Sequence, residues 1–215
     1  MDDALLGKEA VTIMASAYFD FVRHGEPVGG NKIRGQSNDP LSERGWQQMR
    51  AATGTACRWD RVVTSPLVRC YDFARDVAST FGLPLQTDER LKEIGFGSWE
   101  GQSHRDLSAT DPFLLQRFWL NPEQFAPPGA EPVRQFAARI SAAWEDLVAQ
   151  SKDQRVLVVC HAGVIRMTLR HVLALAPENV FRIKVPYAGV TRFMVEPGPD
   201  GSTMSYLLSH AGGLD

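Results

Sequence analysis

Two histidines in this sequence each stand at the end of a largely apolar run of residues. His24 follows the run that begins at Phe19, and His161 follows a valine-rich run that ends at Cys160. A glycine comes close behind each histidine. An imidazole can act as a nucleophile or a proton carrier near neutral pH, and glycine lets the backbone approach a ligand closely. We therefore predict chemistry at the ends of two buried strands.

Two arginines accompany the histidines. Arg23 directly precedes His24, and Arg69 follows the pair Ser65 and Pro66, which is typical of a helix start. An arginine in the first turn of a helix is electrostatically unfavourable unless an anion binds there. Guanidinium forks match phosphate oxygens, and the backbone N–H groups after Pro66 and Ala162 add positive dipoles. These residues predict a site for a phosphoryl group.

The available side chains suggest how such a group would react. No aspartate-rich cluster of the kind that holds a metal accompanies them, so the nucleophile should be a protein group, and a neutral imidazole is available. Nearby arginines favour the neutral imidazole because a second cation is disfavoured beside them. Glu93, in a glycine-rich segment, is the best candidate for the acid that protonates the leaving oxygen, with Glu100 as a nearby alternative.

The pattern of the whole chain is that of an α/β fold, which would bring these side chains to one edge of a sheet. The carboxyl ends of parallel strands meet at such an edge, and ligands bind there. Strands are predicted at Phe19 to Arg23, Arg61 to Thr64, Pro84 to Asp88 and Arg155 to Cys160, with a closing pair within Val180 to Leu208. Helices are predicted from about Glu43 to Ala56, from a Ser65 cap to about Phe81, from Val133, and from Val164 to Leu175.

Two irregular segments should cover this edge. Residues 26–40 are rich in glycine, proline and asparagine and read as a loop. Residues 102–131 predict two short helical pieces broken by prolines, a lid-like excursion. We divide the chain into an N-terminal extension, 1–16, expected to be poorly ordered, and a single domain, 17–215.

Composition narrows the class of protein. The 215 residues are 44% hydrophobic and 22% charged, with a net charge of -2, which argues against disorder and against a broad nucleic-acid surface. The three cysteines lack metal-ligand spacing, and no stretch reaches the ~20 apolar residues that span a bilayer. The N-terminus lacks the basic start of a secretory signal. We expect a cytoplasmic protein, a monomer or homodimer, whose partner is a small phosphorylated substrate.

Several blocks of sequence together resemble the histidine phosphatase superfamily, the phosphoglycerate mutase-like proteins. They occur in that family's order between residues 18 and 166. The blocks are Val22-Arg23-His24-Gly25-Glu26, Arg34-Gly35-Gln36, Pro40-Leu41-Ser42-Glu43-Arg44-Gly45, Ser65-Pro66-Leu67-Val68-Arg69-Cys70, Glu93 to Gly101, and His161-Ala162-Gly163-Val164-Ile165-Arg166. The resemblance implies a three-layer αβα sandwich with a mostly parallel central sheet. It also implies a phosphohistidine mechanism without metal or cofactor.

The resemblance further implies roles for individual residues. His24 would attack phosphorus, while Arg23, Arg69 and His161 would hold the phosphoryl oxygens. Glu93 would protonate the leaving group and then help to activate water. The residues expected to contact the substrate are Arg23, Asn31, Gln36, Arg69, His161 and Ala162, although Asn31 stands one position later than in relatives.

Within the superfamily, the sequence is more similar to phosphatases than to mutases. The interval from Glu93 to His161 is too short for the insertion of cofactor-dependent phosphoglycerate mutases, and Gly163 stands where those enzymes carry asparagine. Residues 119–131 are similar to the α-ribazole phosphatase branch. We therefore expect a phosphomonoesterase that acts on a small metabolite, with α-ribazole 5'-phosphate or a related nucleotide as the named substrate. A mutase-type phosphoryl transferase and a non-catalytic protein that binds phosphorylated ligands remain alternatives.

Overall fold

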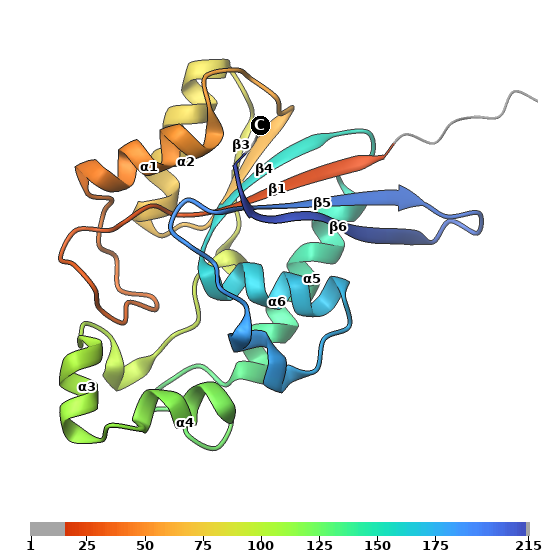
Figure 1. Ribbon diagram of the computed structural model, residues 1–215. Helices are drawn as coiled ribbons and strands as arrows, with labels where there is room; N and C mark the ends of the chain where they lie inside the picture. Colours follow the sequence, from red (N-terminus) through yellow and green to blue (C-terminus); the bar gives the residue numbers. More distant parts are fainter. Residues whose placement is uncertain (1–15, 214–215) are drawn as a thin grey trace, which may run out of the picture.

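A six-stranded sheet forms the centre of this computed structural model, which describes residues 16–213. The strand order is β3-β2-β4-β1-β5-β6, and three of the five ladders, from β3 to β1, are parallel, whereas β5 and β6 run antiparallel to their neighbours. Figure 1 shows the arrangement. The strands are β1 (Ala17–Arg23), β2 (Arg61–Thr64), β3 (Leu85–Thr87), β4 (Arg155–Cys160), β5 (Val190–Pro197) and β6 (Thr203–Gly212).

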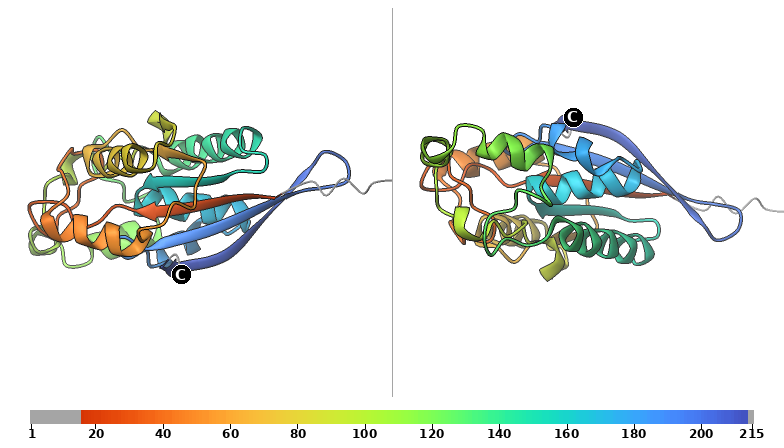
Figure 2. Two further views of the ribbon diagram at one scale, coloured as in Figure 1. Left: turned by 90° about the horizontal axis from the view of Figure 1, so that it is seen from above. Right: turned by 90° about the horizontal axis from the view of Figure 1, so that it is seen from below.

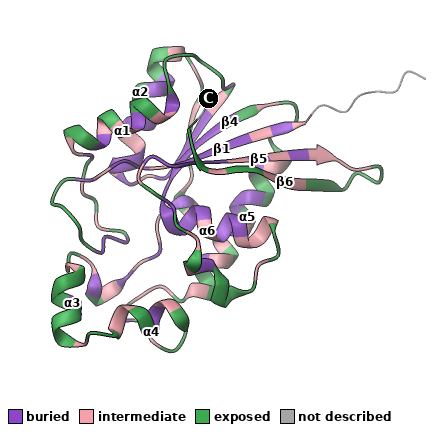
Figure 3. Ribbon diagram, in the orientation of Figure 1, coloured by how far each residue is buried: buried purple, intermediate pink, exposed green. Residues whose placement is uncertain are grey.

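Helices cover both faces of the sheet and make the fold a three-layer sandwich, as predicted. Helices α1 (Glu43–Thr53) and α2 (Val68–Phe81) lie on one face, and α5 (Val133–Ala149) and α6 (Ala162–Val172) lie on the other (Figure 2). The central strands and the inward helix faces are buried (Figure 3). Each face of the sheet packs against its helices through its own apolar core. The two cores together fix the position of the strand ends.

Strand β1 shows why this sequence forms a buried strand. Its side chains alternate between the two cores: Phe19 and Phe21 pack against Trp144 of α5, with ring centroids 5.1 and 5.9 Å away, and Val22 faces the opposite core. Burying one such phenylalanine stabilises the fold by roughly 1.5–3 kcal/mol. The polar Asp20 is also buried, but its carboxylate accepts hydrogen bonds from Trp59 and Arg192.

The helix starts partly differ from the predictions. Helix α1 begins as predicted after Ser42, whose hydroxyl accepts from the Gly45 N–H, but it ends at Thr53, before Gly54. Helix α2 begins at Val68 after Leu67, so the predicted Ser65 cap with Pro66 as first helical residue is wrong. The hydroxyl of Ser65 is instead used by a histidine, as described below. Helix α6 begins at Ala162, two residues before the predicted Val164.

The predicted excursion holds two short helices, α3 (His104–Thr110) and α4 (Leu114–Leu120). Helix α3 begins with a capping box between Ser103 and Asp106. The excursion packs through an aromatic cluster in which Phe118 contacts Phe96 and Phe181 at 5.8 and 5.7 Å between ring centroids. The described residues also contain three 3-10 helices: η1 (Glu89–Leu91), η2 (Gly97–Trp99) and η3 (Pro177–Arg182).

For the two ends of the chain, the sequence predicted an N-terminal extension and a closing pair of strands. All but the last residue of the predicted extension 1–16 lies outside the described residues, so its predicted order is not tested. At the other end, the predicted closing pair of strands is confirmed by β5 and β6. In the described part of the chain, no helix combines the length and the apolar character needed to cross a membrane.

Candidate active site

The two histidines lie side by side because of the register of two parallel strands. Arg23 of β1 pairs with Cys160 of β4, so the next residue of each strand is a histidine. The rings of His24 and His161 have centroids 5.2 Å apart, and the His24 N–H donates to the Cys160 carbonyl at 2.9 Å. Both side chains are buried, with exposed fractions of 6% and 0%. The structure thus brings together residues 137 positions apart in sequence.

His24 is oriented by the backbone of its neighbour. Its Nδ1 lies 2.7 Å from the Gly25 carbonyl oxygen, which can only accept, so Nδ1 carries the proton and Nε2 is left with its lone pair. Burial, followed by the charges of Arg69 and Arg23, lowers the pKa of His24 well below its ordinary 6.5. The ring is therefore neutral at physiological pH, the form in which an imidazole is nucleophilic.

His161 is oriented by a serine. Its Nε2 makes a 2.7 Å hydrogen bond with Oγ of Ser65, which is itself fully buried between β2 and α2. The same Oγ accepts from the Leu67 N–H. Burial and then Arg69 lower the pKa of His161 well below its ordinary value, so this ring is also neutral.

Arg69 is held by backbone carbonyls rather than by a carboxylate. Its side chain is 1% exposed, and its two terminal nitrogens donate to the carbonyls of Ser37 and Gly35 at 2.6 and 2.7 Å. Within residues 16–213, its Nε is buried without a hydrogen-bond partner. An orphaned buried donor is costly unless a ligand accepts from it. No carboxylate of these residues forms a direct ion pair with the guanidinium, so its donors remain available to an anion.

Arg23 is held in a similar way. Its Nη1 donates to the carbonyl of Val185 at 2.6 Å, and its Nε is likewise buried without a partner. The ring of Tyr187 lies under the guanidinium, with 4.1 Å between Cζ and the ring centroid. By contrast, Arg139 outside the cluster is paired with Glu131 at 2.7 Å. Two arginines whose charges are not cancelled thus converge beside two neutral imidazoles.

Glu93 is the carboxylate that lies beside the cluster. Its Oε2 accepts from the Gly163 N–H at the start of α6, and its Oε1 accepts from its neighbour Ile94, both at 3.0 Å. Arg139 donates to the backbone carbonyls of Lys92 and Glu93 and so fixes this segment. The carboxylate lies close enough to Arg23 and Arg69 to oppose the burial-induced lowering of their pKa values.

Glu100, the alternative carboxylate, is fully engaged by the backbone. Its two oxygens accept from the N–H groups of Gln36, Ser37 and Phe96 at 2.8–3.0 Å. These bonds tie residues 34–37 to residues 93–100. Glu100 therefore has a structural position, which leaves Glu93 as the carboxylate placed beside the histidines.

The other residues predicted to contact the substrate differ in burial and in their hydrogen bonds. Gln36 is exposed and its amide donates to the Glu93 carbonyl at 3.3 Å. Ala162 is the buried first residue of α6, next to His161. Asn31 is exposed in the loop and makes no hydrogen bond or ion pair with any described residue of the cluster, so its contact with substrate remains a prediction.

Some residues in or beside the site were not predicted from the sequence. Ser65 was assigned to a helix cap, and Tyr187 and Arg139 were not singled out. Tyr187 lies in the segment before β5, where no periodic pattern points to a site. Arg34, noted only as part of a loop, is buried and donates to the carbonyls of Val28 and Gly30, where its charge contributes to lowering the pKa of His24.

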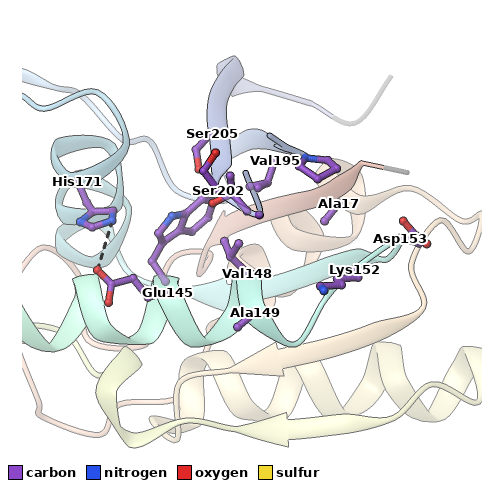
Figure 4. A pocket seen from close by; sticks show the side chains of 14 residues that line it. Ala17, Glu145, Val148, Ala149, Lys152, Asp153, His171, Val195, Ser202 and Ser205 are labelled. Carbon is purple, nitrogen blue, oxygen red and sulfur yellow. Dashed lines mark ion pairs between the residues drawn. The ribbon is translucent and has the colours of Figure 1, made fainter. Parts of the chain in front are cut away.

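A separate cavity of about 800 Å³ lies near the other end of the strands. It is bordered by Ala17 at the start of β1, by α5 and by the β5–β6 hairpin, and His171 faces Glu145 at its rim, 4.0 Å apart (Figure 4). None of the residues of the histidine cluster borders it. Within residues 16–213, no group of three or more histidine, cysteine, aspartate or glutamate side chains is placed to hold a metal ion.

Comparisons with known proteins agree with this geometry. The sequence profile of the histidine phosphatase superfamily, branch 1, matches residues 19–205. A bifunctional protein of Mycobacterium tuberculosis is 32% identical over 90% of this chain, and the chain spans only 54% of its length. The adenosylcobalamin/alpha-ribazole phosphatase of Escherichia coli is 30% identical over 76% of this chain and 83% of the enzyme.

A solved structure gives the same result. A mycobacterial glucosyl-3-phosphoglycerate phosphatase superposes with a TM-score of 0.80 at 27% identity, covering 92% of this chain and 100% of that one. The profile match covers most of the sequence and includes every residue of the histidine cluster. The chain therefore belongs to the histidine phosphatase superfamily.

Proposed function

We propose that this protein hydrolyses a small phosphomonoester through a phosphohistidine formed on His24, without a metal ion. One observation carries the proposal. A neutral imidazole with a free Nε2 lies beside two guanidinium groups, Arg23 and Arg69, which form no direct ion pair with any carboxylate in the described part of the chain. Two such cations complement a dianionic phosphoryl group, and each presents a buried Nε without a partner.

The first step forms a bond from Nε2 of His24 to phosphorus and breaks the bond to the ester oxygen. Arg23, Arg69 and His161 stabilise the charge on the three transferring oxygens. Glu93, in its acid form, gives its proton to the departing oxygen, so that the product leaves as an alcohol. Its Oε2 accepts from the Gly163 N–H at the start of α6, two residues after His161, and this supports the assignment.

The second step reverses these roles. A water molecule attacks the phosphohistidine, the carboxylate of Glu93 accepts its proton, and the nitrogen–phosphorus bond breaks. Inorganic phosphate leaves, and His24 regains its free Nε2. The hydrogen bond from Nδ1 to the Gly25 carbonyl is kept throughout, because Nδ1 keeps its proton in both the free and the phosphorylated ring.

For the substrate we propose α-ribazole 5'-phosphate or a related nucleotide. The support is the similarity of residues 119–131 to that branch and the match to the Escherichia coli enzyme. A ring of the substrate could stack on Trp119 of the excursion, which is half-buried, whereas Trp99 and Trp144 are buried in the core. The Trp119 ring centroid lies 6.4 Å from that of Phe96, three residues after Glu93, and this proximity supports an aromatic contact with the leaving group.

A panel assay tests the proposal. The protein is incubated, in the presence of a chelator, with α-ribazole 5'-phosphate, glucosyl-3-phosphoglycerate or p-nitrophenyl phosphate, and the free phosphate is measured. We expect phosphate release from at least one, loss of it in His24→Ala, and retention in the matched variant His171→Ala, whose ring lies at the remote cavity. Inhibition by the chelator would refute the metal-independent mechanism.

The same assay separates the alternatives. A mutase would need a bisphosphate primer and would return an isomer of a phosphoglycerate rather than free phosphate. A non-catalytic relative would bind orthophosphate but release none from p-nitrophenyl phosphate. Acid-labile, base-stable phosphate on the protein, present in the wild type and absent from His24→Ala, would identify the phosphohistidine.

A further inference from the structure

The segment Val185–Gly189 wraps around the end of β1. The Arg23 N–H donates to the Gly189 carbonyl at 3.1 Å, and the Ala188 N–H donates to the His24 carbonyl at 3.3 Å. Ala188 has φ +54°, a left-handed conformation that is unfavourable for any residue other than glycine. A strained residue persists only where its surroundings fix it, and such residues gather at functional sites.

This strained turn presents Tyr187 to the cluster. The Tyr187 ring centroid is 4.1 Å from Cζ of Arg23 and 5.9 Å from the ring centroid of His24. On the same segment, the carbonyl of Val185 accepts from Nη1 of Arg23. One short stretch of chain therefore fixes the guanidinium in two ways, through a carbonyl at one nitrogen and through an aromatic ring against its face.

An aromatic ring solves a problem that a carboxylate cannot. The guanidinium of Arg23 is partly buried and held in one orientation, yet its charge must stay available to a phosphoryl group. A carboxylate partner, such as Glu131 beside Arg139, holds a guanidinium but cancels its charge. The negative face of an aromatic ring stabilises a cation while leaving its net charge at +1, and the attraction is stronger where water is excluded.

We infer that Tyr187 is a positioning residue that acts through Arg23, holding the guanidinium by the π face of its ring for phosphoryl binding. The inference rests on the proposed function and adds a residue to its machinery. The phenolic oxygen also lies close enough to Arg23 to raise its pKa, and Tyr187→Phe separates this effect from the contact with the ring face. The property that matters is the electron density of the ring face.

A series of rings with equal shape and decreasing electron density tests this directly. Tyr187 is replaced by phenylalanine and then by its mono-, di- and trifluorinated forms through non-canonical incorporation. We expect Tyr187→Phe to stay within about twofold of wild type, and kcat/KM to fall stepwise by about tenfold across the series, because a desolvated cation–π contact contributes on this order. The inhibition constant of orthophosphate should rise in parallel.

The chain offers a matched control. Arg155 stacks on Tyr18 at 4.7 Å, at the opposite end of β1, and the same substitutions at Tyr18 should leave kcat/KM unchanged. Thermal unfolding of each variant confirms that the fold is retained. A ring that merely filled space would give a flat series at position 187, since the size of the ring hardly changes.

The outcomes separate this inference from the proposed function. A flat series in a protein that turns over substrate overturns the role of Tyr187 and leaves the phosphatase proposal intact. If the wild type hydrolyses no phosphomonoester, the proposed function fails, and calorimetry with orthophosphate still tests Tyr187. Equal phosphate affinity across the series would then overturn the inference, and a graded loss would support it.

Discussion

The carboxylate of Glu93 and the backbone of Gly163 are packed so closely that no side chain fits between them. Oε2 of Glu93 accepts from the Gly163 N–H at 3.0 Å, and a β-carbon at position 163 would lie 2.1 Å from Oε1 and 3.1 Å from a ring carbon of Phe136. Glycine at this position is thus a condition for the placement of the carboxylate beside the histidines.

Gly163→Ala should displace Glu93. We expect kcat/KM to fall by at least tenfold for alkyl phosphates, whose leaving oxygen needs a proton, and less for p-nitrophenyl phosphate, whose leaving group does not. Overpacking should also lower the free energy of unfolding by about 1–3 kcal/mol. The control is Gly212→Ala, where an added β-carbon meets no atom within 4 Å. Equal losses for both classes of substrate would contradict a displaced proton donor.

Glu93 and Glu100 should respond differently to the same chemical change. Glu93→Gln removes a proton donor and should lower kcat by roughly 10²–10⁴-fold, whereas the two backbone hydrogen bonds that it weakens should lower Tm less than the three at Glu100. Glu100→Gln weakens three hydrogen bonds from backbone N–H groups and should instead lower stability by about 1–3 kcal/mol. Steady-state kinetics and thermal unfolding of both variants check this. The reverse pattern would move the proton donor to Glu100.

Ser65→Ala should disturb His161 without disturbing the sheet. The substitution leaves Nε2 of a fully buried histidine without its 2.7 Å partner, at a cost of about 1–3 kcal/mol in stability. We expect a loss of about tenfold in kcat/KM, consistent with a mobile ring. Nitrogen NMR of the histidines should show a change in the tautomer signals of His161. Unaltered His161 signals would show that Ser65 does not orient the ring.

The two buried histidines should make stability depend on pH. Burial, with Arg69 as the next cause, lowers the pKa of both His24 and His161 well below 6.5, so the unfolded chain binds protons that the folded chain does not. Their contribution is fully present above pH ~6.5 and is lost as the pH falls from there toward the folded-state values. In that window each histidine contributes a slope of about 1.4 kcal/mol per pH unit.

Urea denaturation between pH 5 and 8 measures this slope. The double variant His24→Asn, His161→Asn removes both titrating groups and should show a flatter dependence than the wild type. Other groups, such as Asp88, titrate equally in both proteins and cancel in the comparison. Parallel curves for the two proteins would show that the histidines retain ordinary pKa values in the folded state.

The meeting of His24 and His161 could be predicted from the sequence because each ends a buried parallel strand, and such ends share an edge. Glu93 was also the predicted proton donor, but the sequence alone offered little ground for preferring it to Glu100. Both lie in one glycine-rich segment, and only the folded loop shows which carboxylate the backbone N–H groups occupy. Ser65 was assigned to the wrong partner because a Ser-Pro pair at a strand end is typical of a helix start, and a contact 96 residues away leaves no local signal.

Tyr187 illustrates a different limit. Its position depends on the left-handed Ala188, and alanine gives no sequence signal for that conformation as glycine would. The predicted starts of α2 and α6 were each displaced by two residues for a related reason, since neither helix begins with a side-chain capping hydrogen bond that the sequence could signal.

The hydrogen bonds of Glu100 connect Arg69 to the segment that carries Glu93. Arg69 donates to the carbonyls of Gly35 and Ser37, and the N–H of Ser37 donates to Glu100, which also holds Phe96 in the Glu93 segment. Helices α3 and α4 are outside this circuit of hydrogen bonds and pack beside it through aromatic rings. We therefore expect that exchanging the excursion between relatives would alter the preference for a leaving group while the circuit itself stays intact.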